Sequence, residues 1–380
     1  MGFDSGRVSF RLFHLRQGLP RRGGIEQFAA RAAPPIETLT RDAIQGWVSW
    51  RHLLDREITE DTCLFTSWIH LNLMRAERKI PGALLRAYCR IEEEIERRAR
   101  QVDQLHRKAR AEVKERVVEQ LLPTMPPTLT GIGCVVDLRN DRLLVEAMSD
   151  AQIERFCPFF RETTGQMPVL MTAETTALLR SRVNATDLLP ASFTTDAAVE
   201  SEVETGLGLE FLTWLWYTWE KDGGVFHVGS GDTFGYMLEG PLVFFREGEG
   251  AHEAVLRKGS PLLSREAGTA LFCGKKLKRA KLTLARGDQT WEATIDADFS
   301  IRGLKLPPGE QPDPVGQFQE RMLAIETFIE AYFTLYDTFI ALRRDPAAWS
   351  LCLGGLQNWV AQLASGRLAP ARGESRAAPR

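Results

Sequence analysis

IPGALLRAYCRIEEEIERRARQVDQLHRKARAEVKERVVEQLL, residues 80–122, is the stretch on which the prediction of the fold depends. Its apolar residues recur in steps of three and four, which places them on one stripe of a helix. They are Leu84, Tyr88, Ile91, Ile95, Ala99, Val102, Leu105, Ala109, Val113, Val117 and Leu121. Neither Pro nor Gly interrupts the pattern between Gly82 and Pro123. We therefore predict one unbroken helix, roughly 55–60 Å long at 1.5 Å per residue.

A helix of that length can be placed in three ways. It pairs with another helix, or it stands out from its domain as an arm, because one domain core is too small to cover the whole stripe. Alternatively, it lies solvated and charged across its own domain.

The segments around this helix predict an α+β protein with antiparallel sheets and a very long protruding helix. Short alternating stretches predict strands on both sides of the helix, and a longer periodic pattern returns after Val315. Around Trp214 the chain is apolar almost all round, so we interpret its three Trp residues as the core of a buried helix rather than as a base-stacking platform. The predicted domains are residues 1–185 with the helical arm 82–122, a linker 186–204, a sheet domain 205–312, C-terminal helices 313–365 and a disordered tail 366–380.

Composition and charge narrow the class of protein. The chain of 380 residues has a net charge of −2, so any attraction to nucleic acid must come from a local patch. The six Cys are scattered, with no CxxC pair, and no stretch is long and apolar enough to span a membrane. We expect a cytoplasmic protein with no membrane partner and no cofactor.

A local basic patch occurs between Glu266 and Asp288, where six positive residues stand without an acid. A tight turn at Gly287 and Asp288 predicts a hairpin in which Leu284 faces Trp291 and Leu282 faces Ala293. In one interpretation the cations bind phosphate. In the other, Arg279 and Lys281 pair with Asp296 and Glu292 across the hairpin. In this register Lys275, Lys276 and Lys278 have no carboxylate in reach, so we favour them as the free charges.

Catalytic motifs are missing from the sequence. The segment from Gly268 to Lys276 departs from a phosphate-binding loop in its spacing and in its last residue, and the six His show no metal-binding spacing. We predict no catalytic and no metal-binding residue. One alternative stays open, because Asp296 and Asp298 share a strand face and could hold magnesium for phosphodiester cleavage.

Several linked motifs resemble the RdgC family of recombination-associated proteins. They are Gly46-Trp47-Val48, the segment Arg75 to Pro81, the long helix ending in Leu121-Leu122-Pro123, and the stretch from Gly274-Lys275-Lys276 to Lys305. The resemblance implies a protein without known enzymatic turnover, although the family also carries an exonuclease label. It implies a homodimer closed into a ring that encircles double-stranded DNA without sequence preference, associates with the nucleoid and restrains a RecA-type recombinase.

The resemblance also implies site residues. The basic pair of the family that contacts DNA falls at Arg257 and Lys258. Together with the basic segment, the candidate DNA-binding residues are Arg257, Lys258, Lys275, Lys276, Lys278, Arg279 and Lys281. The dimer gate falls at the end of the long helix, at Leu122, Met125, Pro126 and Pro127, where the family has an aromatic residue that this chain lacks.

The sequence therefore predicts a ring-shaped, DNA-binding homodimer that modulates RecA-dependent recombination. Two alternatives remain, a magnesium-dependent DNA exonuclease and a scaffold whose long helix pairs with another helix.

Overall fold

The computed structural model describes residues 2–20, 23–40, 42–195, 206–229, 231–246, 253–257, 262 and 264–366. The chain divides into two compact units. We call them the arm unit, Leu15–Leu143 with Ala151–Met167, and the sheet unit, Met1–His14 with Leu144–Asp150 and Pro168–Arg380. The segments predicted as a sheet domain, 205–312, and as C-terminal helices, 313–365, thus lie in one unit together with the first strand. The predicted tail lies outside the described residues from 367 onward.

The arm unit is built on an antiparallel sheet in which the long strand β4 (Trp68–Arg78) lies between β2 (Ile44–Ser49) and β5 (Pro127–Asp137). The short strand β3 (Leu64–Phe65) also pairs with β4, and β6 (Arg142–Val145) follows β5. The helices of this unit are α1 (Gly24–Ala29), η1 (Ile36–Thr38), α2 (Glu60–Cys63), α3 (Gly82–Ala99), α4 (Arg107–Leu121), η2 (Leu122–Thr124) and α5 (Asp150–Thr164).

Trp47 is the centre of the arm-unit core. Its ring packs edge-on against Phe28, at 5.0 Å between centroids, and against Phe156, at 5.8 Å. Its indole N–H donates to the hydroxyl of Thr163 at 2.8 Å, which satisfies the polar atom of a buried Trp. The residue before Trp47 must be a glycine for steric reasons, because a Cβ at Gly46 would collide with the backbone of Ala33.

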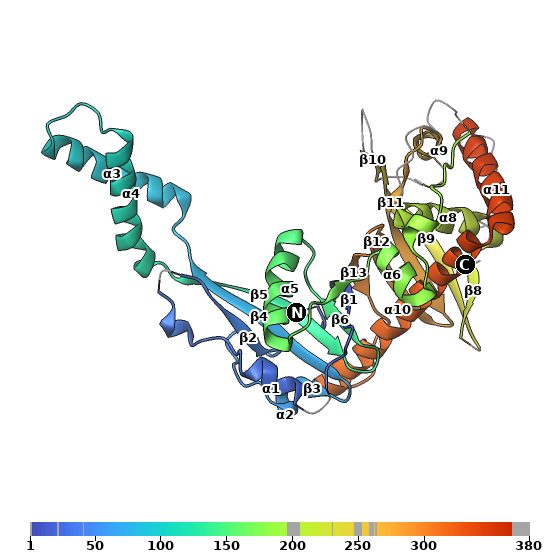
Figure 1. The fold of residues 1–380 in the computed structure, drawn as a ribbon, viewed down its shortest axis with the longest axis horizontal. Helices are drawn as coiled ribbons and strands as arrows, with labels where there is room; N and C mark the ends of the chain where they lie inside the picture. Colours follow the sequence, from blue (N-terminus) through green and yellow to red (C-terminus); the bar gives the residue numbers. More distant parts are fainter. Residues whose placement is uncertain are drawn as a thin grey trace, which may run out of the picture. The chain divides into compact units, whose positions relative to one another are not determined.

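The prediction of one unbroken helix from Ile80 to Leu122 is wrong. The chain leaves the helix after Ala99, turns through Gln101 at φ 55°, and returns as α4, so that α3 and α4 form an antiparallel hairpin that stands away from the strands of its unit (Figure 1). The reversal buries Ala109, Val113 and Val117, which are each 1% exposed. A straight helix would leave that half of the stripe in water, so hydrophobic burial favours the turn although no Gly or Pro marks it.

The sheet unit contains six antiparallel strands in the order β1 (Val8–His14), β13 (Ile301–Lys305), β12 (Gln289–Asp296), β11 (Lys276–Arg286), β9 (Asp232–Phe245) and β10 (Glu253–Leu256). The short strands β7 (Val169–Leu170) and β8 (Val225–Val228) pair with β1 and β9. The helices are α6 (Ala173–Ser181), η3 (Ala185–Asp187), α8 (Leu207–Asp222), α9 (Arg265–Phe272), α10 (Pro314–Arg344) and α11 (Pro346–Ser365).

The core of the sheet unit lies around α8, as predicted. Trp214 and Trp216 are buried, and Phe211 lies against Tyr336 with ring centroids 5.0 Å apart. Gly223 ends the helix in the left-handed conformation at φ 77°. The Trp-rich stretch is therefore a core helix, and the prediction is confirmed.

The segment predicted as a linker, 186–204, is packed where it is described. Ala191 and Phe193 are 3% exposed, and the N–H of Ala191 donates to the carboxylate of Glu210 at 2.9 Å. Residues 196–204 lie outside the described part of the chain. Within that described part, no helix is long and apolar enough to cross a lipid bilayer.

Candidate nucleic-acid interface

The predicted hairpin of β11 and β12 has the expected register. Leu284 faces Trp291, Leu282 faces Ala293, and Arg279 faces Asp296. Arg279 forms a two-point ion pair with the Asp296 carboxylate, and Lys281 lies 2.9 Å from both Glu239 and Glu292. The interpretation in which these two cations pair across strands is confirmed, and it leaves them poor candidates for binding phosphate.

The prediction that Lys276 has no carboxylate in reach is wrong. Its side chain is buried, and Nζ lies 3.2 Å from Oε1 of Glu210 on α8. Arg343 of α10 lies 3.2 Å from the other oxygen of the same carboxylate. Burial lowers the pKa of Lys276, and the Glu210 carboxylate opposes that shift. A side chain that is 8% exposed and already bound to a carboxylate is a poor candidate for contacting DNA at the surface.

Lys278 is also paired, contrary to the prediction. Its Nζ lies 2.5 Å from Glu253 of β10 and 4.7 Å from the centre of the Phe245 ring. Arg257 is exposed and Lys275 is half-buried, and neither forms an ion pair with a residue in the described ranges. Lys258 lies outside those ranges. Of the seven candidate DNA-binding residues, the structure therefore leaves Arg257 and Lys275 as cations without an ion pair in the described chain.

The two aspartates of the nuclease alternative are engaged by arginines. Asp296 is 5% exposed and binds Arg279 and Arg302, whose Nε donates at 2.6 Å. Asp298 lies beyond the end of β12 and is 3.4 Å from Arg11. In the part of the chain that the structure describes, no three His, Cys, Asp or Glu side chains come together as metal ligands.

The predicted gate residues lie at the base of the hairpin rather than at its free end. Leu122 belongs to η2, Met125 ends that turn, and Pro127 begins β5 opposite Arg78. Arg78 also donates to the carbonyl oxygen of Met125, which ties the segment to β4. The free end of the hairpin is the turn at 100–106, so the segment after Leu122 is not the end of the arm, and its part in a dimer gate stays a prediction.

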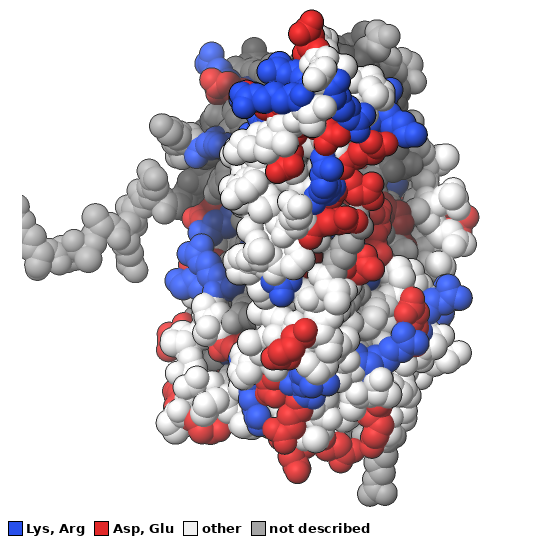
Figure 2. Space-filling view, turned by 90° about the vertical axis from the view of Figure 1, so that its left-hand side faces the viewer, with Lys and Arg blue, Asp and Glu red and all other residues white. Residues whose placement is uncertain are grey.

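The arm exposes three apolar side chains of the stripe that the sequence periodicity predicted, and only the structure shows that they face solvent. On α3 an apolar row faces solvent, with Tyr88 44%, Ile91 56% and Ile95 54% exposed. The face turned toward α4 is instead partly acidic, because Glu96 accepts from both Arg100 and Arg116, at 2.7 and 2.9 Å. Figure 2 looks onto the side of the molecule that carries the arm and shows Lys and Arg side chains among Asp and Glu.

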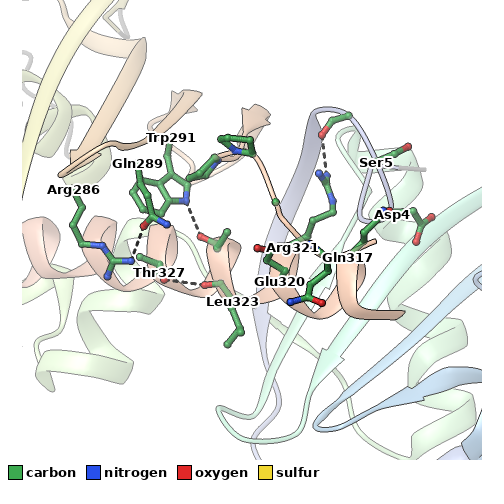
Figure 3. Close-up of a pocket in the computed structure, with 16 residues that line it drawn as sticks. Asp4, Ser5, Arg286, Gln289, Trp291, Gln317, Glu320, Arg321, Leu323 and Thr327 are labelled. Atoms are coloured by element: carbon green, nitrogen blue, oxygen red, sulfur yellow. Dashed lines mark hydrogen bonds between the residues drawn. The ribbon is translucent and has the colours of Figure 1, made fainter. Parts of the chain in front are cut away.

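A polar pocket of about 410 Å³ lies in the sheet unit beside α10 (Figure 3). Two of its charged side chains, Arg321 and Glu320, are hydrogen-bonded to backbone groups of the same chain. The guanidinium of Arg321 donates to carbonyl oxygens of Gly2, Phe3 and Gly6 at 2.7 to 2.9 Å, and Glu320 accepts from two backbone N–H groups. Trp291 donates to the carbonyl of Ala324 at 2.9 Å. These contacts hold the first residues and the 306–312 segment against α10.

By its fold and its described surface, the chain is an α+β protein that presents a charged two-helix arm. Residues 26–203, which include the whole arm, match the RdgC family model, described as "Putative exonuclease, RdgC". The match covers 178 of the 380 residues and supports the assignment of the chain to the RdgC family. No curated protein matches it.

Proposed function

We propose that the chain is a non-sequence-specific double-stranded DNA-binding protein that acts as a ring-shaped homodimer and modulates RecA-dependent recombination at the nucleoid. The observation that carries the proposal is the arm, which exposes an apolar row and an excess of cations on one narrow hairpin. Large apolar side chains that gather on a surface mark interaction sites. Assignment to the RdgC family supports DNA as the ligand, and a second copy of the chain is the partner that we propose for the apolar row.

The proposed contact with DNA needs charge rather than base recognition. Lys and Arg that neutralise backbone phosphates release counterions, so the affinity falls steeply as the salt concentration rises. We propose that the protein holds DNA without enzymatic turnover. Support comes from Asp296, which two guanidinium groups already occupy.

The first prediction concerns self-association. Replacing Ile91 and Ile95 by Glu puts two charges on the exposed apolar row, and we expect the homodimer to dissociate to monomers at micromolar concentration. Sedimentation velocity measures the mass of the species, and far-UV circular dichroism shows whether the helices persist. Replacing Leu351, which is 81% exposed on α11, by Glu is the matched control and should leave the dimer intact. A wild-type protein that is monomeric up to tens of micromolar would contradict the homodimer.

The second prediction separates binding from cleavage. In a gel shift with magnesium at two salt concentrations, we expect linear and closed circular duplexes to be retained at low salt and released at high salt, with their lengths unchanged. A ring that must thread onto DNA loads more slowly on the closed circle. Magnesium-dependent shortening of the linear duplex that EDTA abolishes would instead establish the exonuclease. Absence of retention at low salt would favour the scaffold.

A further inference from the structure

We infer that one long face of the arm hairpin is a cationic surface that binds the phosphate backbone of DNA. We call it the arm pad, and it consists of Arg86, Arg90 and Arg97 on α3 with Arg107, Arg110 and Lys114 on α4. The inference rests on the proposed function and assigns its DNA contact to the arm. The sequence had instead placed this contact on the basic segment that forms β11.

The position of each pad residue follows from the turn of 100° per residue in an α-helix. On α4 the buried row of Ala109, Val113 and Val117 faces α3. Arg107, Arg110 and Lys114 recur at i, i+3 and i+7, which places them on one flank of the buried row. The acids of α4 fall on the other flank and are Glu112, Glu115 and Glu119.

The same division occurs on α3. Leu85, Cys89 and Glu96 are partly buried on the side toward α4. Arg86, Arg90 and Arg97 lie on one flank of that side, and the exposed apolar row of Tyr88, Ile91 and Ile95 lies on the other.

The antiparallel arrangement brings the two cationic flanks to one face. Both helices are right-handed, so reversing the direction of α4 turns its cationic flank toward the same side as that of α3. The opposite face of the hairpin carries the carboxylates. Arg116 binds Glu96 there, with Glu92 and Glu112 nearby, and these carboxylates raise the pKa of Arg116. The arm therefore has one cationic face and one face that is apolar and acidic.

The six pad cations have no carboxylate partner in the described chain, a property that they share with Lys108 on the opposite flank of α4. All six are exposed, and none forms an ion pair with a residue that the structure describes. Arg98, Arg100 and Arg116 are paired instead, with Glu94 and Glu96. Glu93 is the acid nearest to the pad by helical position.

The fold does not require cations at these positions. Arg107 and Arg110 stand in the first turn of α4, which contains no acid, and a positive charge at a helix N-terminus is unfavourable because it opposes the helix dipole. Placing them there weakens the helix, so a ligand that carries negative charge accounts for them better than stability does.

The dimensions suit a duplex better than an acidic peptide. Arg86 and Arg97 are eleven residues apart, so the pad runs for roughly 16 Å along the hairpin. A duplex presents about one phosphate per 1.7 Å of axis, which gives roughly ten phosphates over that length. A rigid row of cations matches such a continuous polyanion.

The test compares two variants with the same net charge. The pad variant is Arg90→Gln, Arg97→Gln and Arg110→Gln. The control variant is Arg98→Gln, Arg100→Gln and Arg116→Gln, which removes three paired cations from the same two helices. Fluorescence anisotropy with a short duplex gives the slope of log Kobs against log salt concentration. Each lost phosphate contact lowers the slope by about 0.9, so we expect a decrease of about 2 to 3 for the pad variant and none for the control.

Further measurements distinguish a failure of the proposed function from a failure of the arm pad. A third variant with Lys at the same three pad positions retains charge and should retain the slope, and circular dichroism confirms that each hairpin is folded. If the wild type shows no salt-dependent binding, the proposed function fails. If the wild type binds and the pad variant matches the control, the arm pad is wrong and the DNA contact lies elsewhere. Competition by polyglutamate as strong as that by the duplex at equal charge would overturn the inference in favour of an acidic protein partner.

Discussion

Replacing Glu210 by Gln is expected to lower the free energy of unfolding of the sheet unit by about 3–5 kcal/mol, the cost of leaving buried charges unpaired. Glu210 is fully buried and lies 3.2 Å from both Lys276 and Arg343. Glutamine has nearly the same shape, and its amide oxygen can still accept the N–H of Ala191. Its NH2 group replaces the oxygen that faces Arg343, so the charge and one acceptor are removed together. Two cations would then share a buried site without a counter-ion.

The measurement is a urea titration read by hydrogen exchange of α8 and β11, which reports the sheet unit separately. Glu239→Gln is the control, because its carboxylate pairs with Lys281 at 2.9 Å on a half-exposed surface and should cost less than about 1 kcal/mol. Burial already lowers the pKa of Lys276, so the Glu210→Gln variant should recover part of its stability as the pH rises toward 10.5 and Lys276 loses its proton. Equal losses for the two variants would show that the buried charges are not coupled.

The arm unit is expected to lose several kcal/mol of stability between pH 6.5 and pH 3 through His70 alone. Burial lowers the pKa of His70 from 6.5 to about 3. As the pH falls below 6.5, the His70 imidazole becomes protonated in the unfolded chain, whereas in the folded chain it stays neutral until about pH 3. Stability therefore declines by about 1.4 kcal/mol per pH unit across that window.

The His70→Phe variant tests the sign and the size of this effect. Phenylalanine keeps a ring beside Trp50, whose centroid lies 5.7 Å from that of His70, and it does not titrate. Unfolding free energies at pH 6, 5 and 4 should fall less steeply in this variant than in the wild type. His52→Gln, at an exposed position, serves as the control and should keep the wild-type slope. Identical slopes for wild type and His70→Phe would mean that His70 is protonated in the folded state.

Local patterns predicted the elements whose partners are close in sequence. The hairpin register of β11 and β12 follows from alternating side chains and a tight turn, and it correctly paired Arg279 with Asp296. The buried helix α8 follows from its nearly continuous apolar sequence and the Gly223 that ends it. In each case the deciding interactions join residues within about one turn or one hairpin.

Lys276 shows why the candidate site could not be predicted in the same way. Its counter-ion Glu210 is 66 residues away on another helix, and only the packing of α8 against β11 brings them together. Lys278 is likewise paired by β10, which is joined to β11 through β9. A run of basic residues in a sequence shows how many cations are present. It does not show which carboxylates the tertiary packing places beside those cations.

The amino-acid sequence by itself determined the α+β class, the antiparallel hairpins, the helical character of residues 82–99 and 107–121 and the resemblance to the RdgC family, because these depend on local periodicity and on linked motifs. Only the tertiary structure decided that the helical stretch folds back on itself, because a 100° periodicity is the same for a straight helix and for a hairpin. The reversal follows from burying Val113 and Val117 against α3, a gain that appears only once two segments meet. That same contact sorts the arm charges into two faces, so the candidate DNA surface is a property of the packed hairpin and not of its sequence pattern.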